Sequence, residues 1–169
     1  DSRGEQREAM TRMPTRIPHR LVNQQNTADL LKTFNEVNMQ PAMGMRSRHQ
    51  EAFQKKYGIK LGFMSFFIKA AVEALKQFPV VNASIDGNDI VYHNYFDVGV
   101  AVSTPRGLVV PIVRDADALS FAELEQTVAD YAARARDGKL TMEQLSGGTF
   151  TITNGGVFGS LLSTPILNP

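Results

Sequence analysis

Three histidines are the side chains best suited to acid–base chemistry in this sequence, because histidine titrates close to neutral pH. They are His19, His49 and His93. None belongs to a recognisable motif, and none has a second histidine or a glutamate at a metal-ligand spacing. We interpret each as a surface or structural residue, and we predict no metal site. The absence of cysteine excludes a thiolate metal site, a disulfide and a cysteine nucleophile.

A cluster of glycines at residues 155–159 is the second candidate for chemistry. It follows a strand-like stretch, the position that a phosphate-binding loop would occupy. Its spacing is not G-x-G-x-x-G, and it lacks the Lys-Ser/Thr pair of a P-loop, so we exclude a dinucleotide site. Two interpretations remain. The cluster is either a tight structural loop, or a loop whose glycines let the backbone approach a ligand while Thr153 presents a hydroxyl at the strand end.

A turn over residues 103–107 is the third candidate. Its sequence is Ser-Thr-Pro-Arg-Gly, in which proline suits the second turn position and glycine relieves the last. Arg106 in this turn can reach an anionic group. A solvated turn explains the same residues, so both interpretations stay open. The residues alone therefore indicate an α/β domain with a candidate loop at 153–160, and no defined reaction.

Composition limits the classes of protein to which the chain can belong. Its 169 residues fit one domain, and 43% hydrophobic with 21% charged residues is ordinary for a globular chain. The net charge of +1 gives no electrostatic reason to expect a nucleic acid or an anionic membrane as partner. No apolar stretch reaches the roughly 18 residues of a membrane span, and the first residues contain no apolar signal core.

Helices must position these candidate loops, and two segments in the first half of the chain carry helical signals. Pro41 suits the first turn of a helix that ends at Gly58. Residues 64–78 are apolar apart from a narrow polar stripe, which predicts a helix covered on most of its circumference.

Two capping boxes mark helix starts in the second half. Ser120 and Glu123 open an amphipathic helix that runs over residues 120–137. Thr141 and Gln144 repeat the pattern, which predicts a short second helix immediately afterwards.

Apolar and β-branched runs predict six strands. They lie at residues 30–39, 81–86, 89–92, 96–103, 108–113 and 149–153. Gly87-Asn88 joins the second and third in a two-residue hairpin turn. The fourth and fifth are apolar on nearly every residue, which fits strands buried on two faces. The resulting order β-α-α-β-β-β-β-α-α-β indicates a two-layer α/β or α+β domain with a mixed sheet.

Five stretches of the sequence resemble one family, in order along the chain. They are TFNEVNM at 33–39, LGFMSF at 61–66, VNASIDG at 81–87, RGLVVP at 106–111 and GGTFTITNGGVFGSL at 147–161. Together they resemble the catalytic domain of the 2-oxo acid dehydrogenase acyltransferases, the E2 components, from about residue 10 to 169. The first and last have the form of the succinyl-transferring branch, which serves 2-oxoglutarate dehydrogenase complexes, rather than that of the acetyl or branched-chain relatives.

The resemblance implies a chloramphenicol-acetyltransferase-like fold, an α/β two-layer sandwich with a mixed sheet, that assembles as trimers packed into a hollow cube. It implies an active site between two subunits of a trimer. Coenzyme A enters this site as a substrate from one side, and a lipoyl group carried on a domain outside this chain enters from the other. In this family a histidine of an H-x-x-x-D-G motif acts as general base, and a hydroxyl from the neighbouring subunit stabilises the oxyanion. No metal is implied.

Carried over residue by residue, Thr153 occupies the position of that hydroxyl. A thioester under attack by a thiol develops negative charge on its oxygen, and one preorganised donor is worth about 3 kcal/mol. The other site candidates are polar residues implied to lie near the substrates: Asn154, Ser163 and Thr164 in the pocket, and Ser103 and Arg106 on the coenzyme A side.

Two departures from the family pattern accompany the resemblance. The sequence has no H-x-x-x-D-G motif and stops in an apolar, proline-punctuated segment at 163–169. We therefore expect residues 1–9 to be the end of a linker and residues 10–169 to be a catalytic domain that is incomplete at its C-terminus and inactive alone. A natural loose tail is the alternative. Pro14 and Pro18 lie where relatives have a continuous helix, which interior prolines break.

The resemblance also implies partners. These are further copies in a cubic core, the 2-oxoglutarate dehydrogenase (E1) and dihydrolipoamide dehydrogenase (E3) subunits, and coenzyme A, with no nucleic acid or membrane. The expected location is a bacterial cytoplasm, with the mitochondrial matrix as alternative.

Three hypotheses for the function follow: acyl transfer between lipoyl and coenzyme A thiols, a structural scaffold on which other subunits dock, and a drug acetyltransferase of the same fold. The TFNEVNM run argues against the last.

Overall fold

The computed structural model describes residues 22–23, 26, 30–105 and 107–164. The chain divides into two compact units, one of Asn38–Asn154 and the other of Asp1–Val37 with Gly155–Pro169. The predictions for Pro14, Pro18, His19, Arg106 and the linker at 1–9 lie outside the described residues. No helix among the described residues is long and apolar enough to cross a membrane.

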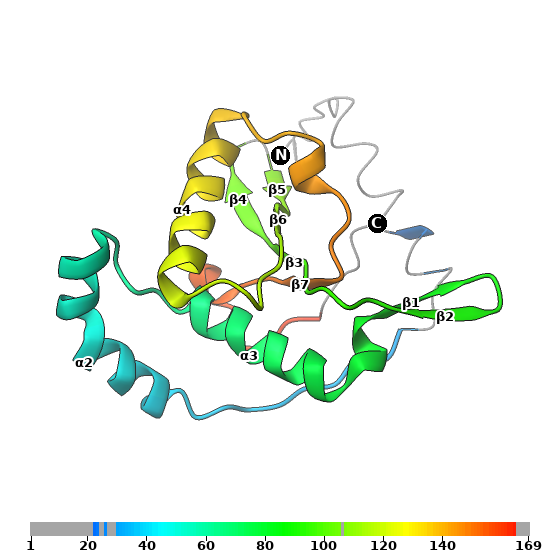
Figure 1. The fold of residues 1–169 in the computed structure, drawn as a ribbon, viewed down its shortest axis with the longest axis horizontal. Helices are drawn as coiled ribbons and strands as arrows, with labels where there is room; N and C mark the ends of the chain where they lie inside the picture. Colours follow the sequence, from blue (N-terminus) through cyan, green and yellow to red (C-terminus); the bar gives the residue numbers. More distant parts are fainter. Residues whose placement is uncertain (1–21, 24–25, 27–29, 106, 165–169) are drawn as a thin grey trace, which may run out of the picture. The chain divides into compact units, whose positions relative to one another are not determined.

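A three-stranded mixed sheet lies at the centre of the larger unit (Figure 1). Its order is β6-β3-β7, and its strands are β3 (Val98–Val100), β6 (Ile112–Val113) and β7 (Phe150–Ile152). β3 is antiparallel to β6 and parallel to β7, so the predicted mixed sheet is confirmed. All three residues of β3 are buried, as an uninterrupted apolar strand predicts.

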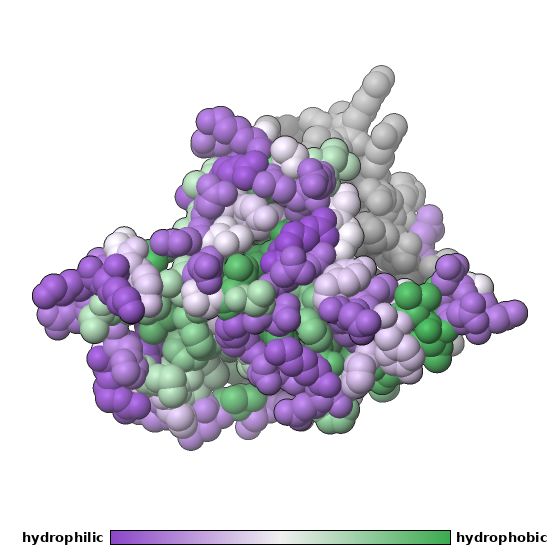
Figure 2. Space-filling view, viewed as in Figure 1, coloured by the Kyte–Doolittle hydropathy of each residue, from purple (hydrophilic) through white to green (hydrophobic). Residues whose placement is uncertain are grey.

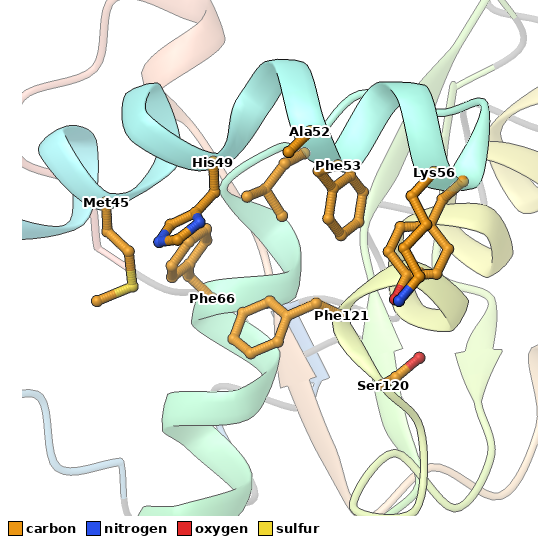
Figure 3. A pocket seen from close by; sticks show the side chains of 11 residues that line it. Met45, His49, Ala52, Phe53, Lys56, Phe66, Ser120 and Phe121 are labelled. Carbon is orange, nitrogen blue, oxygen red and sulfur yellow. The ribbon is translucent and has the colours of Figure 1, made fainter.

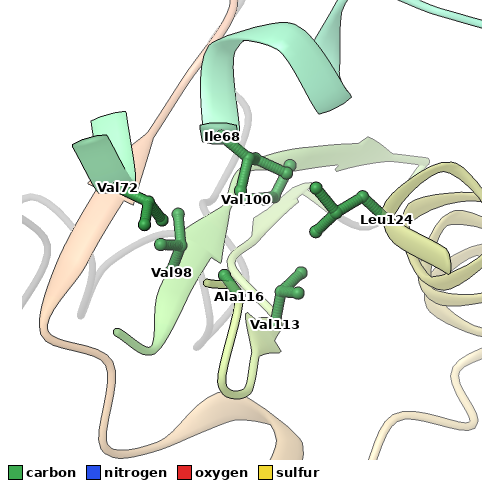
Figure 4. Close-up of a cluster of buried hydrophobic side chains, with 7 residues drawn as sticks. All are labelled: Ile68, Val72, Val98, Val100, Val113, Ala116 and Leu124. Carbon is green, nitrogen blue, oxygen red and sulfur yellow. The ribbon is translucent and has the colours of Figure 1, made fainter. Parts of the chain in front are cut away.

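Two helices cover one face of this sheet, namely α3 (Met64–Gln77) and α4 (Phe121–Asp137). Their apolar side chains meet those of the sheet in one buried cluster (Figure 4). The cluster consists of Ile68, Val72, Val98, Val100, Val113, Ala116 and Leu124. Val98 and Val100 point to the same face of β3 because side chains alternate along a strand. The two layers, sheet and helices, confirm the predicted fold class.

The runs predicted as strands at 96–103 and 108–113 form one antiparallel ribbon that is shared between two sheets. β4 (Val102–Thr104) pairs with β5 (Gly107–Val109), and β3 pairs with β6 in the same register. The ribbon divides at Ala101, whose N–H donates to the carbonyl of Ile152 on β7 over 2.9 Å. Only β3 and β6 are buried, so the expectation of burial along the whole of both runs is wrong.

A separate hairpin projects from the larger unit (Figure 1). It consists of β1 (Ala83–Asp86) and β2 (Asp89–Tyr92), with Gly87 in the turn at φ 59°. The predicted hairpin is thus confirmed, although its first strand begins two residues later than expected, because Pro79–Asn82 forms a 3-10 turn. The buried Asn82 amide donates to two carbonyls at the hairpin exit, those of His93 and Tyr95, each over 3.0 Å.

Local signals at helix ends are confirmed. The Ser120 hydroxyl accepts from the N–H of Glu123 over 3.3 Å, and the Glu123 carboxylate accepts from the N–H of Ser120 over 2.7 Å. Thr141 and Gln144 make the same reciprocal pair over 3.4 and 3.1 Å. The second box opens only a single 3-10 turn, Glu143–Leu145, rather than an α-helix.

The helix predicted after Pro41 is α2 (Gln40–Tyr57), and it ends at Gly58 in the left-handed conformation as expected. It buries no residue. Hydrogen bonds to one backbone segment hold it: the Gln50 side chain both accepts from and donates to Leu61, over 2.7 and 3.0 Å, and Arg46 donates to the Leu61 carbonyl over 2.8 Å.

Two further sequence predictions are wrong in the described residues. Residues 30–39 form no strand, although they are rich in β-branched and apolar types. Strand formation needs a ladder partner, and none of the described strands pairs with this segment. α3 is buried along one stripe only, at Ser65, Ile68, Val72 and Leu75, while Ala70 and Ala74 are exposed.

Candidate active-site edge of the sheet

Thr153 follows β7 directly and lies at the carboxyl edge of the central sheet. Since β3 and β7 are parallel, the carboxyl ends of both strands lie at this same edge. Ile152, the residue before Thr153, pairs with Val100 and accepts the hydrogen bond from Ala101. Thr153 itself is exposed. Thr153 is therefore a hydroxyl-bearing residue that is exposed to solvent. It follows a strand whose backbone is hydrogen-bonded to the central strand segment up to the preceding residue.

Gly99 permits the close packing of β7 against β3. It pairs with Thr151 of β7 on one side and with Ile112 of β6 on the other. A Cβ at this position would lie 2.9 Å from the Val110 Cγ1, closer than real Cβ contacts, and 3.1 Å from the Thr151 Oγ1, tighter than most of them. Sequence reasoning did not single out this glycine, because the contacts that require it come from residues distant in the chain.

The opposite edge of the sheet is held by a group that sequence reasoning also missed. Asp97, immediately before β3, has a buried carboxylate that accepts from the Arg114 guanidinium over 2.7 Å and from the Asp115 N–H over 2.9 Å. Its backbone carbonyl accepts from the N–H of Thr149, immediately before β7, over 2.7 Å. One aspartate thus connects the starts of β3 and β7 with the end of β6.

Arg114 extends this connection into the segment between α4 and β7. Besides Asp97, it donates to the backbone carbonyls of Glu143, Ser146 and Gly147 over 3.0, 2.5 and 3.2 Å. One guanidinium group therefore fixes three carbonyl groups and a carboxylate, which its five donors in a planar fork allow.

Ser103 lies on β4, the strand that continues from the carboxyl end of β3. The structure thus brings the segment that carries Ser103 and the residue Thr153 to the same edge of the central sheet. Ser103 is exposed and pairs with Leu108, and the turn beyond it is closed by the Thr104 hydroxyl, which donates to the Gly107 carbonyl over 2.8 Å.

The remaining predicted site residues are exposed. Asn154 follows Thr153 in the larger unit, whereas Ser163 and Thr164 belong to the smaller one. Within that smaller unit the Ser163 and Ser160 hydroxyls are hydrogen-bonded to each other. The glycine cluster forms a tight turn, Gly156–Phe158, that ends at Gly159 with φ 77°. The implied grouping of Ser163 and Thr164 with Thr153 stays a prediction.

His93 and Asp97 have the spacing H-x-x-x-D, with Val98 where the family motif has glycine. Their surroundings do not support a catalytic pair. The Asp97 carboxylate is engaged by Arg114, and the His93 ring packs against Tyr95 with centroids 5.3 Å apart. Among the described residues, no group of three or more His, Cys, Asp or Glu side chains could hold a metal ion.

His49 lines a cavity of about 440 Å³ between α2, α3 and the start of α4 (Figure 3). Most of its lining is apolar, from Met45, Ala52, Phe53, Leu61, Phe66 and Phe121. Among the described residues that line the cavity there is no carboxylate, so none of them can orient His49 as a base. We therefore place the candidate site at the sheet edge and not in this cavity.

Solved structures with this fold define the class of protein. Azotobacter vinelandii dihydrolipoamide acetyltransferase, in which a serine, a histidine and an asparagine were investigated for their role in the catalytic mechanism, matches with a TM-score of 0.91 and 30% identity over 98% of this chain and 69% of its own. The cubic core of a pyruvate dehydrogenase multienzyme complex matches with a TM-score of 0.90 and 30% identity, again over 98% of this chain and 69% of its own. The fold is that of the E2 acyltransferase catalytic cores.

The chain belongs to the 2-oxoacid dehydrogenases acyltransferase (catalytic domain) family, which it matches over residues 2–169. The dihydrolipoyllysine-residue succinyltransferase component of the 2-oxoglutarate dehydrogenase complex of Cupriavidus necator is 61% identical over 99% of this chain. The chain spans 40% of the length of that curated relative. The resemblance to the succinyl-transferring branch, predicted from the sequence, is confirmed.

Proposed function

We propose that the complete protein transfers a succinyl group between a lipoyl thiol and coenzyme A within a 2-oxoglutarate dehydrogenase complex. The observation that carries this proposal is the 61% identity to the Cupriavidus necator succinyltransferase component over 99% of the chain. Because the chain spans 40% of that relative, the activity, its substrates and its partners are proposed for the complete protein. A bacterial cytoplasm is proposed as its location.

The reaction is a thiol–thioester exchange. The sulfur of the attacking thiol forms a bond to the thioester carbon, which leaves a tetrahedral intermediate with a negative oxygen. The carbon–sulfur bond to the other thiol then breaks, and the proton removed from the attacking thiol is returned to the departing one. We assign the Thr153 hydroxyl as donor to the negative oxygen. Its place at a strand end with a fixed backbone supports this role, because a donor stabilises the transition state only if it is already positioned.

The general base is proposed to be a histidine of an H-x-x-x-D-G motif, which these 169 residues do not contain. The part of the site proposed for this chain is therefore the oxyanion donor and the substrate contacts. Asn154, Ser163 and Thr164 are proposed for the substrate pocket. Ser103 and Arg106 are proposed for coenzyme A, and the position of β4 after the carboxyl end of β3 supports the choice of Ser103.

A trimeric unit within a cubic core is proposed as the assembly, with E1 and E3 subunits and a lipoyl-carrying domain as partners. Exposed apolar side chains support it. Phe78 before the hairpin, and Ile85 and Ile90 within it, are 61%, 82% and 57% exposed. Figure 2 shows this surface as green patches over the hairpin. A surface of this kind is typical of protein–protein contact. In this assembly the protein would also act as the scaffold on which the other subunits dock, as a second role beside acyl transfer.

The experiment that tests the function uses the full-length protein with succinyl coenzyme A and dihydrolipoamide, and follows thioester formation. We expect Thr153→Ala to lower kcat by about 10²–10³-fold, because one oxyanion donor is lost. Thr153→Ser is the matched control, since it keeps the hydroxyl, and it should retain most of the activity. An unchanged kcat in Thr153→Ala would refute the assigned role. Faster turnover with acetyl coenzyme A would place the protein in the acetyl branch instead.

A further inference from the structure

Three residues lie at equivalent positions on one edge of the central sheet. Asp97 comes immediately before β3, Thr149 immediately before β7, and Arg114 immediately after β6. Because β6 is antiparallel to the other two strands, all three residues meet at the edge opposite Thr153. We call Asp97, Arg114 and Thr149 the edge clamp.

Contacts between Asp97 and Thr149 join β7 to β3 from both backbone and side chain. The Thr149 N–H donates to the Asp97 carbonyl over 2.7 Å, and the Asp97 N–H donates to the Thr149 hydroxyl over 3.3 Å. The Asp97 carboxylate is then held by Arg114 over 2.7 Å, with the two side chains 9% and 42% exposed. This partial burial reduces the screening that weakens fully exposed ion pairs.

β7 depends on contacts at its ends because it has only three residues. At its carboxyl end, the Ala101–Ile152 hydrogen bond holds the backbone just before Thr153. At its amino end, the edge clamp holds the backbone. Arg114 also donates to three backbone carbonyls in the segment before β7, those of Glu143, Ser146 and Gly147. Gly148, next to Thr149, has no room for a Cβ, which would lie 2.8 Å from the Ile112 Cδ1. Thr149 directly precedes β7 and is bonded to Asp97, so we expect a displacement at Thr149, rather than one farther back in the segment, to move β7.

We infer that Arg114 is a positioning residue for acyl transfer, which holds β7 in register on β3 and so fixes the place of the Thr153 hydroxyl. This inference rests on the proposed role of Thr153. Arg114 lies at the edge opposite Thr153, so it would act on the site along a three-residue strand. A misplacement of a catalytic group by about 1 Å can lower the rate about 100-fold, so a remote clamp has a measurable effect on turnover.

Arg134 provides a matched control in the same region. It donates to the Lys139 carbonyl over 3.3 Å and to the Gln144 side chain over 2.8 Å, and it pairs with Asp130 at 3.5 Å. It therefore anchors the segment after α4 much as Arg114 does, but none of these contacts is to a strand. Loss of Arg134 should disturb the segment without moving Thr153.

The test uses the full-length protein and measures kcat, the KM for coenzyme A and the thermal unfolding midpoint of each variant. We expect Arg114→Met to lower kcat about tenfold or more with KM changed less than about twofold. Arg134→Met should keep kcat within about twofold of the unchanged protein. Arg114→Lys keeps the charge but not the planar fork, so its kcat should be intermediate. Equal losses of kcat in Arg114→Met and Arg134→Met would overturn the inference.

A double-mutant cycle with Thr153→Ala separates positioning from a general loss of structure. If Arg114 acts through Thr153, Arg114→Met should change kcat by less than about twofold in the Thr153→Ala background. A further tenfold loss in that background would overturn the inference while leaving the role of Thr153 intact. A kcat unaffected by Thr153→Ala alone would instead refute the proposed role of Thr153, on which this inference rests. If Arg114→Met does not fold, Asp97→Asn replaces it in the same double-mutant cycle. This substitution weakens the ion pair with Arg114 but keeps an oxygen that accepts from the Asp115 N–H.

Discussion

The central strand β3 and the hairpin β1–β2 both contain β-branched apolar residues but differ in what covers them. Val98 and Val100 of β3 are buried by two helices and two flanking strands. In the hairpin, Ile85 and Ile90 face each other across the turn and remain largely exposed. A two-stranded hairpin is marginally stable by itself. The pattern of apolar residues therefore predicts a strand in both places, but burial contributes far more free energy to the folded chain at β3 than in the hairpin.

The largest expected difference comes from one substitution in the buried cluster that covers β3 and one in the hairpin. Ile68→Ala removes a side chain that is 0% exposed in the buried cluster, and we expect it to lower the free energy of unfolding by about 2–5 kcal/mol. Ile85→Ala, at 82% exposed, should change it by less than about 0.5 kcal/mol. Urea unfolding of the dissociated catalytic domain measures both. Equal losses would mean that the hairpin is buried by this chain itself.

A smaller loss is expected from a methyl group added inside the sheet. Gly99→Ala places a Cβ 2.9 Å from the Val110 side chain, and such overpacking costs about 1–3 kcal/mol. Gly44→Ala in α2 is the control, because its Cβ would meet only the flexible Arg48 side chain at 3.7 Å. It should stabilise the helix by about 0.5–1 kcal/mol. The same denaturant titration checks both, and a tolerated Gly99→Ala would contradict the close packing of Val110, Ile112 and Thr151 around Gly99.

Substitutions in the hairpin should weaken the assembly of subunits and leave the folding of each subunit almost unchanged. Ile85→Lys and Ile90→Lys add charge to exposed positions and should change the free energy of unfolding by less than about 0.5 kcal/mol. The particle mass measured by light scattering should fall, because a lysine at the centre of an apolar interface is costly to bury. An assembly of unchanged mass would show that another surface forms the contact between subunits.

The smallest effect is expected at the exposed start of α4. Hydrogen bonds from Ser120 lower the pKa of the Glu123 carboxyl below its ordinary value, first the bond from its N–H and then that from its hydroxyl. Burial raises this pKa slightly, and the charge of Lys69 lowers it by a smaller amount. A lowered folded-state pKa stabilises the protein above the unfolded-state pKa of about 4.3, and this stabilisation is lost as the pH falls through the folded-state value. Urea unfolding from pH 7 to pH 3 measures the loss. Glu123→Gln should remove this part of the pH dependence, whereas an identical slope would rule out Glu123 as its source.

Local features of the fold could be predicted from the sequence because they depend on neighbouring residues. The Ser120 capping box, the turn at Gly87 and the helix end at Gly58 involve residues close together in the chain, and all are confirmed. The segment at 30–39 shows the limit of this reasoning. Its β-branched residues favour an extended backbone, but a strand also needs a partner, which a run of residues cannot specify.

Long-range features could not be predicted in the same way. The division of the ribbon at Ala101 depends on a hydrogen bond to Ile152, and the contact between Asp97 and Thr149 spans 52 residues of sequence. No periodicity in the sequence marks either contact. Thr153 is a candidate from its place after an apolar run, but its role as oxyanion donor comes only from the family resemblance, since a threonine in this place is common in any sheet protein. The role of the candidate site thus follows from family resemblance, whereas the edge clamp that supports it is visible only in the folded structure.

The parallel pairing of β7 with β3 also bears on the order in which the chain folds. The paired strands of the ribbon from β3 to β6 are close in the sequence, so we expect their contacts to form early. β7 is separated from β3 in the sequence by the whole of α4, so its pairing closes a long loop. Contacts that close long loops form slowly. We therefore expect the amides of β7 to gain protection from hydrogen exchange after those of β3 and β6 during refolding. The residue proposed to act on the substrate would then be among the last to reach its place, so that a partly folded chain is inactive until the sheet is complete.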